Sequence, residues 1–292
     1  MIIDFHTHMF PDKIAARTID FLSKTGGDMN PFTDGTWKGL KESTKQAGID
    51  HSIVLPIATR PGQFHTINEF ATHFQEGTLI SFGSLHPESE NYKEELKQIQ
   101  DMGMKGIKLH PDYQDTYFND IRYKRIISYA TELGLIISVH AGQDPKCPDN
   151  IHCTPAMAEE VLNEVEPEKL VLAHMGGNEL RSEVEERLVG RNVYFDTGVI
   201  LDRMPQEQFL RMVREHGADR IVFGTDSPWA DQKNFVALLE HMPLTEEEKA
   251  TLTDAAKIFV MKGEKVHIVD GEVFNIKITY PYDLRVAETL IK

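Results

Sequence analysis

Two histidines separated by a single residue, His6 and His8, stand near the start of the chain. They belong to a short run that contains the apolar, mostly β-branched residues Ile2, Ile3 and Phe5, which predicts a buried strand. Because side chains alternate across a strand, the two imidazoles point to the same side. Such a pair is half of a divalent-metal site, although an isolated His-x-His pair also occurs in structural positions.

Further residues that could bind a metal ion or transfer a proton stand at the ends of other predicted strands. If these strands lie parallel in one sheet, their side chains gather at the same edge. Three histidines and one carboxylate of this set provide nitrogen and oxygen ligands for one divalent ion, with Zn²⁺ as the first choice. We expect the four ligands to be His6, His8, His140 and Asp226.

The remaining polar residues at these strand ends fit supporting roles. Asp226 could also accept a proton from water, and His174 could orient that water or protonate a leaving group. Lys108 has three interpretations: a cation that binds a substrate carboxylate, a carboxylated lysine that bridges to a second metal with His174, or an internal ion pair. We expect His110 to contact substrate or stabilise a turn, and Asp4 to support the site from below.

Short β-rich runs and helical patterns alternate through most of the chain. Eight such strands, each followed by a helix, predict an α/β fold of the (β/α)8 TIM-barrel type. An open doubly wound sheet is disfavoured because no Gly-x-Gly-x-x-Gly follows the first strand. The expected strands are residues 1–8, 51–58, 79–85, 106–110, 135–140, 169–174, 192–197 and 220–226. The expected helices are residues 12–24, 37–48, 91–102, 121–133, 155–165, 180–189, 205–216 and 245–261.

The pattern changes near the end of the chain, so we expect two parts. Residues 1–263 would form the barrel domain, and residues 264–292 a short C-terminal appendage. Within the appendage, Asp270-Gly271 lies between two β-rich runs and predicts a hairpin. This hairpin would cover the barrel or join a second subunit, and a homodimer is therefore one possibility.

Composition narrows the classes of function. The chain is 40% hydrophobic and 26% charged, which is ordinary for a globular protein. Its formal net charge of −15 argues against binding to nucleic acid or to an anionic membrane. Two cysteines, Cys147 and Cys153, are too few for a disulfide framework, and no secretory signal or membrane-spanning run is visible. We therefore expect a cytoplasmic protein whose partner is a small-molecule substrate.

With these residues assembled, the chain resembles the amidohydrolase superfamily. It is most similar to the amidohydrolase-related branch that includes aminocarboxymuconate semialdehyde decarboxylase and γ-resorcylate decarboxylase. The similarity rests on six motifs in the family's order: D-F-H-T-H at 4–8, G-I-K-L-H-P at 106–111, S-V-H-A-G at 138–142, L-A-H-M-G-G at 172–177, Y-F-D-T at 194–197 and F-G-T-D-S-P-W at 223–229.

This resemblance implies one metal ion bound by His6, His8, His140 and Asp226, with His174 as an acid or base that does not bind the ion. Members of the branch either hydrolyse C–N or C–O bonds or remove a carboxylate without oxidation. Our leading hypothesis is a metal-dependent hydrolase of a small, carboxylate-bearing carbonyl compound, with Lys108 and His110 recognising the substrate. The alternative is a metal-dependent decarboxylase, and a non-catalytic metal-binding protein is the third hypothesis.

Overall fold

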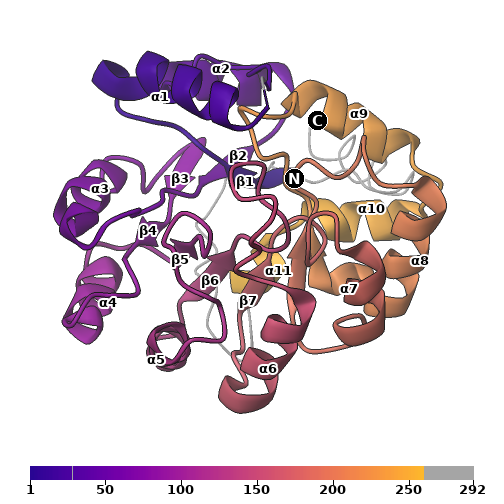
Figure 1. Ribbon diagram of the computed structural model, residues 1–292. Coiled ribbons are helices and arrows are strands. Elements are labelled where there is room, and N and C mark those ends of the chain that lie inside the picture. Colours follow the sequence, from indigo (N-terminus) through magenta and orange to yellow (C-terminus); the bar gives the residue numbers. More distant parts are fainter. Residues whose placement is uncertain (28, 260–292) are drawn as a thin grey trace, which may run out of the picture. The chain divides into compact units, whose positions relative to one another are not determined.

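The computed structural model describes residues 1–27 and 29–259, and these form one compact unit, Met1–Phe259. Within this unit short strands lie in the middle and helices surround them (Figure 1). The strands are β1 (Ile3–Thr7), β2 (His51–Val54), β3 (Leu79–Ser81), β4 (Gly83–Ser84), β5 (Gly106–Leu109), β6 (Ile136–Val139), β7 (Leu170–Leu172), β8 (Tyr194–Asp196) and β9 (Ile221–Val222).

All neighbouring strands are parallel and follow one another in sequence order. One sheet contains β1, β2 and β3, and the other runs from β4 to β9. Hydrogen bonds between the first strand and the segment that begins with β9 join the two ends of this series. The backbone N–H of Phe5 donates to the carbonyl of Phe223 at 2.8 Å, and the N–H of Asp226 donates to the carbonyl of His6 at 2.7 Å. The predicted α/β fold of the TIM-barrel class is confirmed.

Helices follow the strands along the chain, and several begin with side-chain caps. Thr36, Asp120 and Thr154 each accept a hydrogen bond from the first turn of the helix that follows, which satisfies a backbone donor there. The α-helices are α1 (Asp12–Thr25), α2 (Trp37–Gln46), α3 (Phe64–Ala71), α4 (Tyr92–Asp101), α5 (Ile121–Glu132), α6 (Pro155–Val165), α7 (Arg181–Arg187), α8 (Gln206–His216), α9 (Gln232–His241), α10 (Glu246–Thr253) and α11 (Ala256–Phe259).

The structure corrects the expected elements at four places. The third strand is divided at Phe82 into β3 and β4, and two helices, α3 and α9, were not predicted. Both are short, at eight and ten residues, but length alone does not explain the omission, because α2, α4 and α7 are of similar length and were predicted. The expected helix over 245–261 is interrupted at Asp254, whose φ of −91° and ψ of 78° are not helical.

Side chains that alternate along each strand point either outward, to the core beneath the helices, or inward, to the interior of the barrel. On β5, Ile107 and Leu109 belong to the large apolar core that includes residues of α5. Lys108 lies between them and is paired in register with Ser138 of β6, and its Nζ lies 3.5 Å from the Ser138 Oγ. The strand period of two therefore turns this lysine toward polar neighbours.

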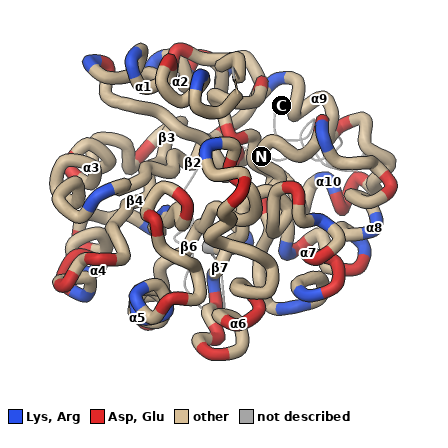
Figure 2. Tube along the Cα trace, in the orientation of Figure 1, with Lys and Arg blue, Asp and Glu red and all other residues tan. Residues whose placement is uncertain are grey.

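Acidic and basic residues are interspersed along the outer helices, including α1, α2, α4 and α8 (Figure 2). None of the helices in the described part of the chain is long and apolar enough to cross a membrane. The predicted hairpin of the C-terminal appendage lies outside the described residues.

Candidate metal centre

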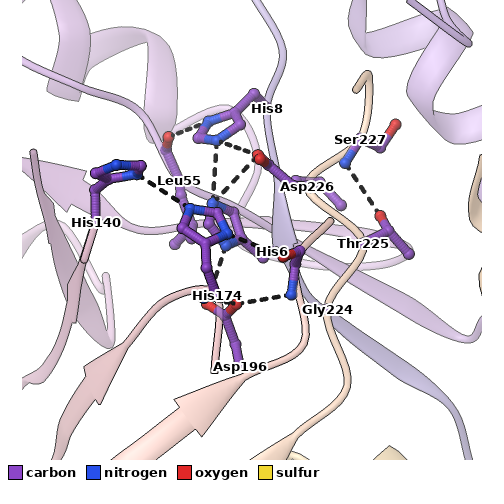
Figure 3. A network of polar contacts seen from close by, with 12 residues as sticks. His6, His8, Leu55, His140, His174, Asp196, Gly224, Thr225, Asp226 and Ser227 are labelled. Atoms are coloured by element: carbon purple, nitrogen blue, oxygen red, sulfur yellow. Dashed lines mark hydrogen bonds and ion pairs between the residues drawn. The ribbon is translucent and has the colours of Figure 1, made fainter. Parts of the chain in front are cut away.

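His6 of β1 and His8, just beyond it, meet Asp226 from the loop after β9 (Figure 3). The Nε2 atoms of the two histidines are 3.2 Å apart. The Asp226 Oδ1 lies 3.0 Å from the His8 Nε2 and 3.4 Å from the His6 Nε2. We call these three residues the convergent cluster.

Hydrogen bonds on the opposite ring nitrogens determine which atoms of this cluster carry protons. The Nδ1 of His8 lies 2.8 Å from the carbonyl of Leu55, which can only accept, so this Nδ1 carries the proton. The Nδ1 of His6 lies 2.9 Å from the Asp196 carboxylate and carries its proton for the same reason. In the neutral imidazoles, both Nε2 atoms therefore present lone pairs to each other and to Asp226.

Three lone-pair atoms that face one another without a proton between them repel one another, and a cation placed between them would relieve that repulsion. A tetrahedral Zn²⁺ site with bonds of about 2.0–2.1 Å separates its ligand atoms by roughly 3.3 Å. The distances in the convergent cluster, 3.0–3.4 Å, match this separation. The rings of His6 and His8 are inclined at 73°, so their planes can meet at one ion. The residues present therefore fit a divalent ion.

The electrostatics of the cluster agree with ligands that are ready to bind. Burial, together with the nearby Lys108, lowers the pKa of His6 to about 4 against the opposing effect of Asp196 and Asp226, so the ring is neutral at neutral pH. Burial by itself would raise the pKa of Asp226, but the neighbouring imidazoles of His6 and His8 outweigh it and bring the pKa to about 2. Asp226 is therefore an anion.

His174 and His140 form a second pair beside this cluster (Figure 3). The His174 Nε2 lies 3.0 Å from the His140 Nδ1, and the His174 Nδ1 donates to the carbonyl of Gly198 at 2.9 Å. His174 thus presents a bare Nε2 to His140. The backbone of His174 has a φ of +59° and that of Asp226 has a φ of +67°, a left-handed conformation that non-glycine residues adopt mainly where surrounding structure imposes it.

Lys108 is fully buried, and its Nζ lies 3.5 Å from the His6 Nε2. Burial lowers the pKa of this ammonium to about 8, against the opposing effect of Asp196 and Asp226. The lysine therefore faces the same nitrogen that would bind an ion.

His110 stacks between two rings in the loop after β5. Its ring centroid lies 3.9 Å from that of Tyr113 and 4.1 Å from that of His140, with the two histidine rings inclined by only 7°. Its Nε2 is 3.7 Å from the Asp144 Oδ2. Together with Asp112, these residues form what we call the stacked cluster: His110, Asp112, His140 and Asp144.

The stacked cluster has metal-binding residue types but an unsuitable shape. An ion lies close to the plane of each imidazole that binds it, because the nitrogen lone pair lies in that plane. The planes of His110 and His140 are nearly parallel and separated by the stacking distance. An ion in the plane of one ring therefore lies well outside the plane of the other.

Asp4 supports the convergent cluster without contacting an imidazole. Its carboxylate accepts hydrogen bonds from the backbone N–H groups of His6 and Thr225, from the Thr225 hydroxyl and from the Gln232 amide. Burial raises the pKa of Asp4 to about 6 despite these donors. The carboxylate joins β1 to the segment that carries Asp226, which agrees with the supporting role expected from the sequence.

The structure brings His6, His8 and Asp226 together, with Lys108 beside them, and it places His140 and His174 as a neighbouring pair. His110 lies on the far side of His140. The donor atoms of His6, His8 and Asp226 fall within 4.8 Å of one another, and the group so defined does not include His140. The role of His140 as a ligand thus remains a prediction.

Sequence reasoning did not assign a role to Asp196, although its carboxylate binds the Nδ1 of His6, a residue of the convergent cluster. It ends β8 and is fully buried, and its Oδ1 accepts the backbone N–H groups of His174 and Gly198 while its Oδ2 binds His6. Burial would raise its pKa, but His6 lowers it below the ordinary range overall. The rule that site residues end strands would have found it. Asp112, Asp144 and His152 were also not assigned, and they come from loops that sequence patterns describe poorly.

A barrel of parallel strands with a candidate metal centre at the strand ends defines a class of metal-dependent enzymes. Residues 3–261 match the amidohydrolase family, and the chain belongs to that family. The resemblance predicted from the motifs is thereby confirmed.

Solved structures with the same fold include several decarboxylases. A 2,6-dihydroxybenzoate decarboxylase from Rhizobium is 15% identical, with a TM-score of 0.66, and the match covers 88% of this chain and 98% of that one. A 5-carboxyvanillate decarboxylase from Sphingomonas paucimobilis is 14% identical, with a TM-score of 0.64 and the same coverage. A 5-carboxyvanillate decarboxylase from Novosphingobium aromaticivorans, solved with manganese, is 13% identical, with a TM-score of 0.66 and coverage of 89% and 96%. At these identities the likeness shows the fold.

Proposed function

We propose that this chain is a metal-dependent hydrolase that cleaves a C–N or C–O bond in a small carbonyl compound. The observation that carries the proposal is the meeting of three lone-pair atoms, the Nε2 of His6, the Nε2 of His8 and the Oδ1 of Asp226. These residues would hold one divalent ion, with Zn²⁺ as the first choice, and His140 would complete the set through its Nδ1. The bound ion would supply Lewis acidity and lower the pKa of a water molecule in its site.

The chain's own residues would handle the protons. Asp226 is an anion at neutral pH, so it can accept a proton from the attacking water. The bare Nε2 of His174 is available to take up a proton and pass it to the leaving group, while the Nδ1 stays bound to the Gly198 carbonyl. His110 would present an Nε2–H group to the substrate, because its Nδ1 accepts the Tyr113 N–H at 3.4 Å.

The place of Lys108 bears on the number of ions. An ammonium 3.5 Å from the His6 Nε2 would repel a divalent ion bound to that nitrogen. A carboxylated lysine would instead attract it, and the His140 Nδ1 and the His174 Nε2 could then hold a second ion. The number of ions therefore depends on whether Lys108 is carboxylated or instead recognises a substrate carboxylate.

The second candidate is a decarboxylase, favoured by the reaction names of the solved structures with this fold. In that case the ion would hold the oxygens of a carboxylate-bearing substrate, and Asp226 or His174 would protonate the carbon that loses carbon dioxide. The same convergent cluster serves both reactions, so its geometry does not choose between them.

Two measurements test these proposals in order. Metal analysis of the purified full-length protein should find about one divalent ion per chain, or about two if Lys108 is carboxylated. A folded protein that binds no divalent ion would overturn both enzyme proposals. A panel of lactones, amides, aryl acids and dienoic acids, assayed for new carboxylate or amine against released carbon dioxide, then separates hydrolysis from decarboxylation.

A further inference from the structure

The two ring nitrogens of His140 lie in different surroundings. The Nδ1 is 3.0 Å from the bare Nε2 of His174, on the side of the convergent cluster. The Nε2 points the other way, 3.8 Å from the Asp112 Oδ2 and 4.0 Å from the Asp144 Oδ2. This Nε2 is buried and has no hydrogen-bond partner among the described residues.

Asp112 is held so that one of its oxygens is left free. Its Oδ1 accepts two hydrogen bonds from His152, one from the backbone N–H at 3.1 Å and one from the Nδ1 at 3.0 Å. Its Oδ2 is buried and makes no hydrogen bond within the described part of the chain. The side chain of Asp112 is fully buried. Two buried atoms without a hydrogen-bond partner thus face each other at 3.8 Å, an arrangement that is unfavourable if left so.

Ion binding would give both the His140 Nε2 and the Asp112 Oδ2 a hydrogen-bond partner, because it would change which ring nitrogen of His140 carries the proton. A neutral imidazole carries a single ring proton. When His140 donates its Nδ1–H to His174, its Nε2 is bare and faces the carboxylate of Asp112. When the Nδ1 binds an ion instead, the proton must lie on the Nε2, and the free oxygen of Asp112 becomes its acceptor.

We propose that Asp112, oriented by His152, is the positioning residue that selects the ion-binding tautomer of His140. The inference rests on the proposed function, because it takes His140 to be an ion ligand. Asp112 suits this role better than Asp144, because the Asp144 Oδ2 also lies 3.7 Å from the His110 Nε2. The chain already contains the same device on β1, where the Asp196 carboxylate binds the Nδ1 of His6 and leaves its Nε2 bare.

The first test compares Zn²⁺ binding by isothermal titration of the ion-free, full-length protein and two variants. Asp112→Asn keeps the size of the side chain but can turn an N–H group toward His140, so we expect the dissociation constant for Zn²⁺ to rise about 10- to 100-fold. The matched control is Asp115→Asn, which also removes one negative charge beside His152, the histidine that orients Asp112. Asp115 is exposed and lies 3.4 Å from the other nitrogen of His152, so this variant should bind Zn²⁺ as the wild type does.

The second test needs no variant of Asp112 and therefore does not depend on its folding. In ¹⁵N-histidine-labelled wild-type protein, Zn²⁺ should move the ring proton of His140 from Nδ1 to Nε2; the His140 signals are assigned by their loss in His140→Gln. The inference is overturned if this proton stays on Nδ1 in the Zn²⁺-bound protein. It is also overturned if folded Asp112→Asn binds Zn²⁺ within about twofold of the wild type. Failure of the proposed function looks different: the wild type would bind no Zn²⁺, or His140→Gln would bind it unchanged.

Discussion

The convergent cluster and the stacked cluster contain the same residue types but differ in geometry. In the convergent cluster the two histidine rings are inclined at 73°, and the opposite nitrogens are fixed by Leu55 and Asp196. In the stacked cluster the two rings are parallel within 7°, and two carboxylates face them at 3.7–4.0 Å. Two histidines and a carboxylate are therefore not sufficient for a metal site; their lone pairs must also converge.

The largest expected difference between the two clusters concerns ion retention. We expect His8→Gln to lose its ion on dialysis, because it removes one of the converging lone pairs. The matched variant His110→Gln should keep the ion, since its ring plane does not reach the site. Metal analysis of both dialysed proteins checks this. Equal retention by the two variants would contradict the assignment of the convergent cluster.

A second difference concerns catalysis by the carboxylates. Asp226→Asn should lower kcat about 10²- to 10⁴-fold on whichever substrate the panel identifies, because the amide cannot accept the proton from water. Asp144→Asn, in the stacked cluster, should lower it by less than about tenfold. Steady-state kinetics on ion-loaded proteins measures both. Full activity in Asp226→Asn would rule out the proton-transfer role.

Asp4 shows what a buried carboxylate does when both oxygens have donors. Asp4→Asn should lower the free energy of unfolding by about 2–4 kcal/mol, because an amide group cannot accept from all four donors. The ion content of the folded variant should not change. Urea denaturation at pH 7.5 measures the loss, with Asp20→Asn as the control. Asp20 is exposed and paired with Lys24, so its variant should stay within about 0.5 kcal/mol of the wild type.

The smallest expected effect concerns a histidine outside both clusters. His216 at the end of α8 stacks on Phe195 at 4.1 Å; its Nδ1 accepts the Gly190 N–H, and its Nε2–H donates to the Val193 carbonyl. Burial lowers the pKa of His216 to about 4, from 6.5 in the unfolded chain. The unfolded state therefore binds more protons between these values, and stability present above pH 6.5 is lost as the pH falls toward 4.

The measurement compares unfolding of the wild type and His216→Phe at pH 7 and pH 4.5. The wild type should lose about 2 kcal/mol more than the variant over this range. Metal content should be the same in both proteins, because both nitrogens of His216 are bound within the fold. An equal loss in the two proteins would contradict the low pKa.

Periodicity and strand ends were sufficient to predict the class of fold. The apolar runs that contain β1, β5 and β6 are nearly continuous, as expected for strands covered by helices, and each is followed by His8, His110 or His140. Periodicity analysis missed α3 and α9, although α2 and α4, which are of similar length, were predicted. It also could not reveal the break at Asp254, which depends on the backbone conformation of one residue.

The sequence by itself determined which residues stand at the strand ends, because strand period and chain order follow from local patterns of apolar residues. Only the tertiary structure decided which of their atoms meet. His6, His8 and Asp226 are brought together by hydrogen bonds between the first strand and the segment after the last one, more than 200 residues apart. Long-range contacts also fix the orientation of the His6 ring and keep its proton on Nδ1, which faces Asp196. Ring orientation and proton position distinguish the convergent cluster, which fits an ion, from the stacked cluster, which does not.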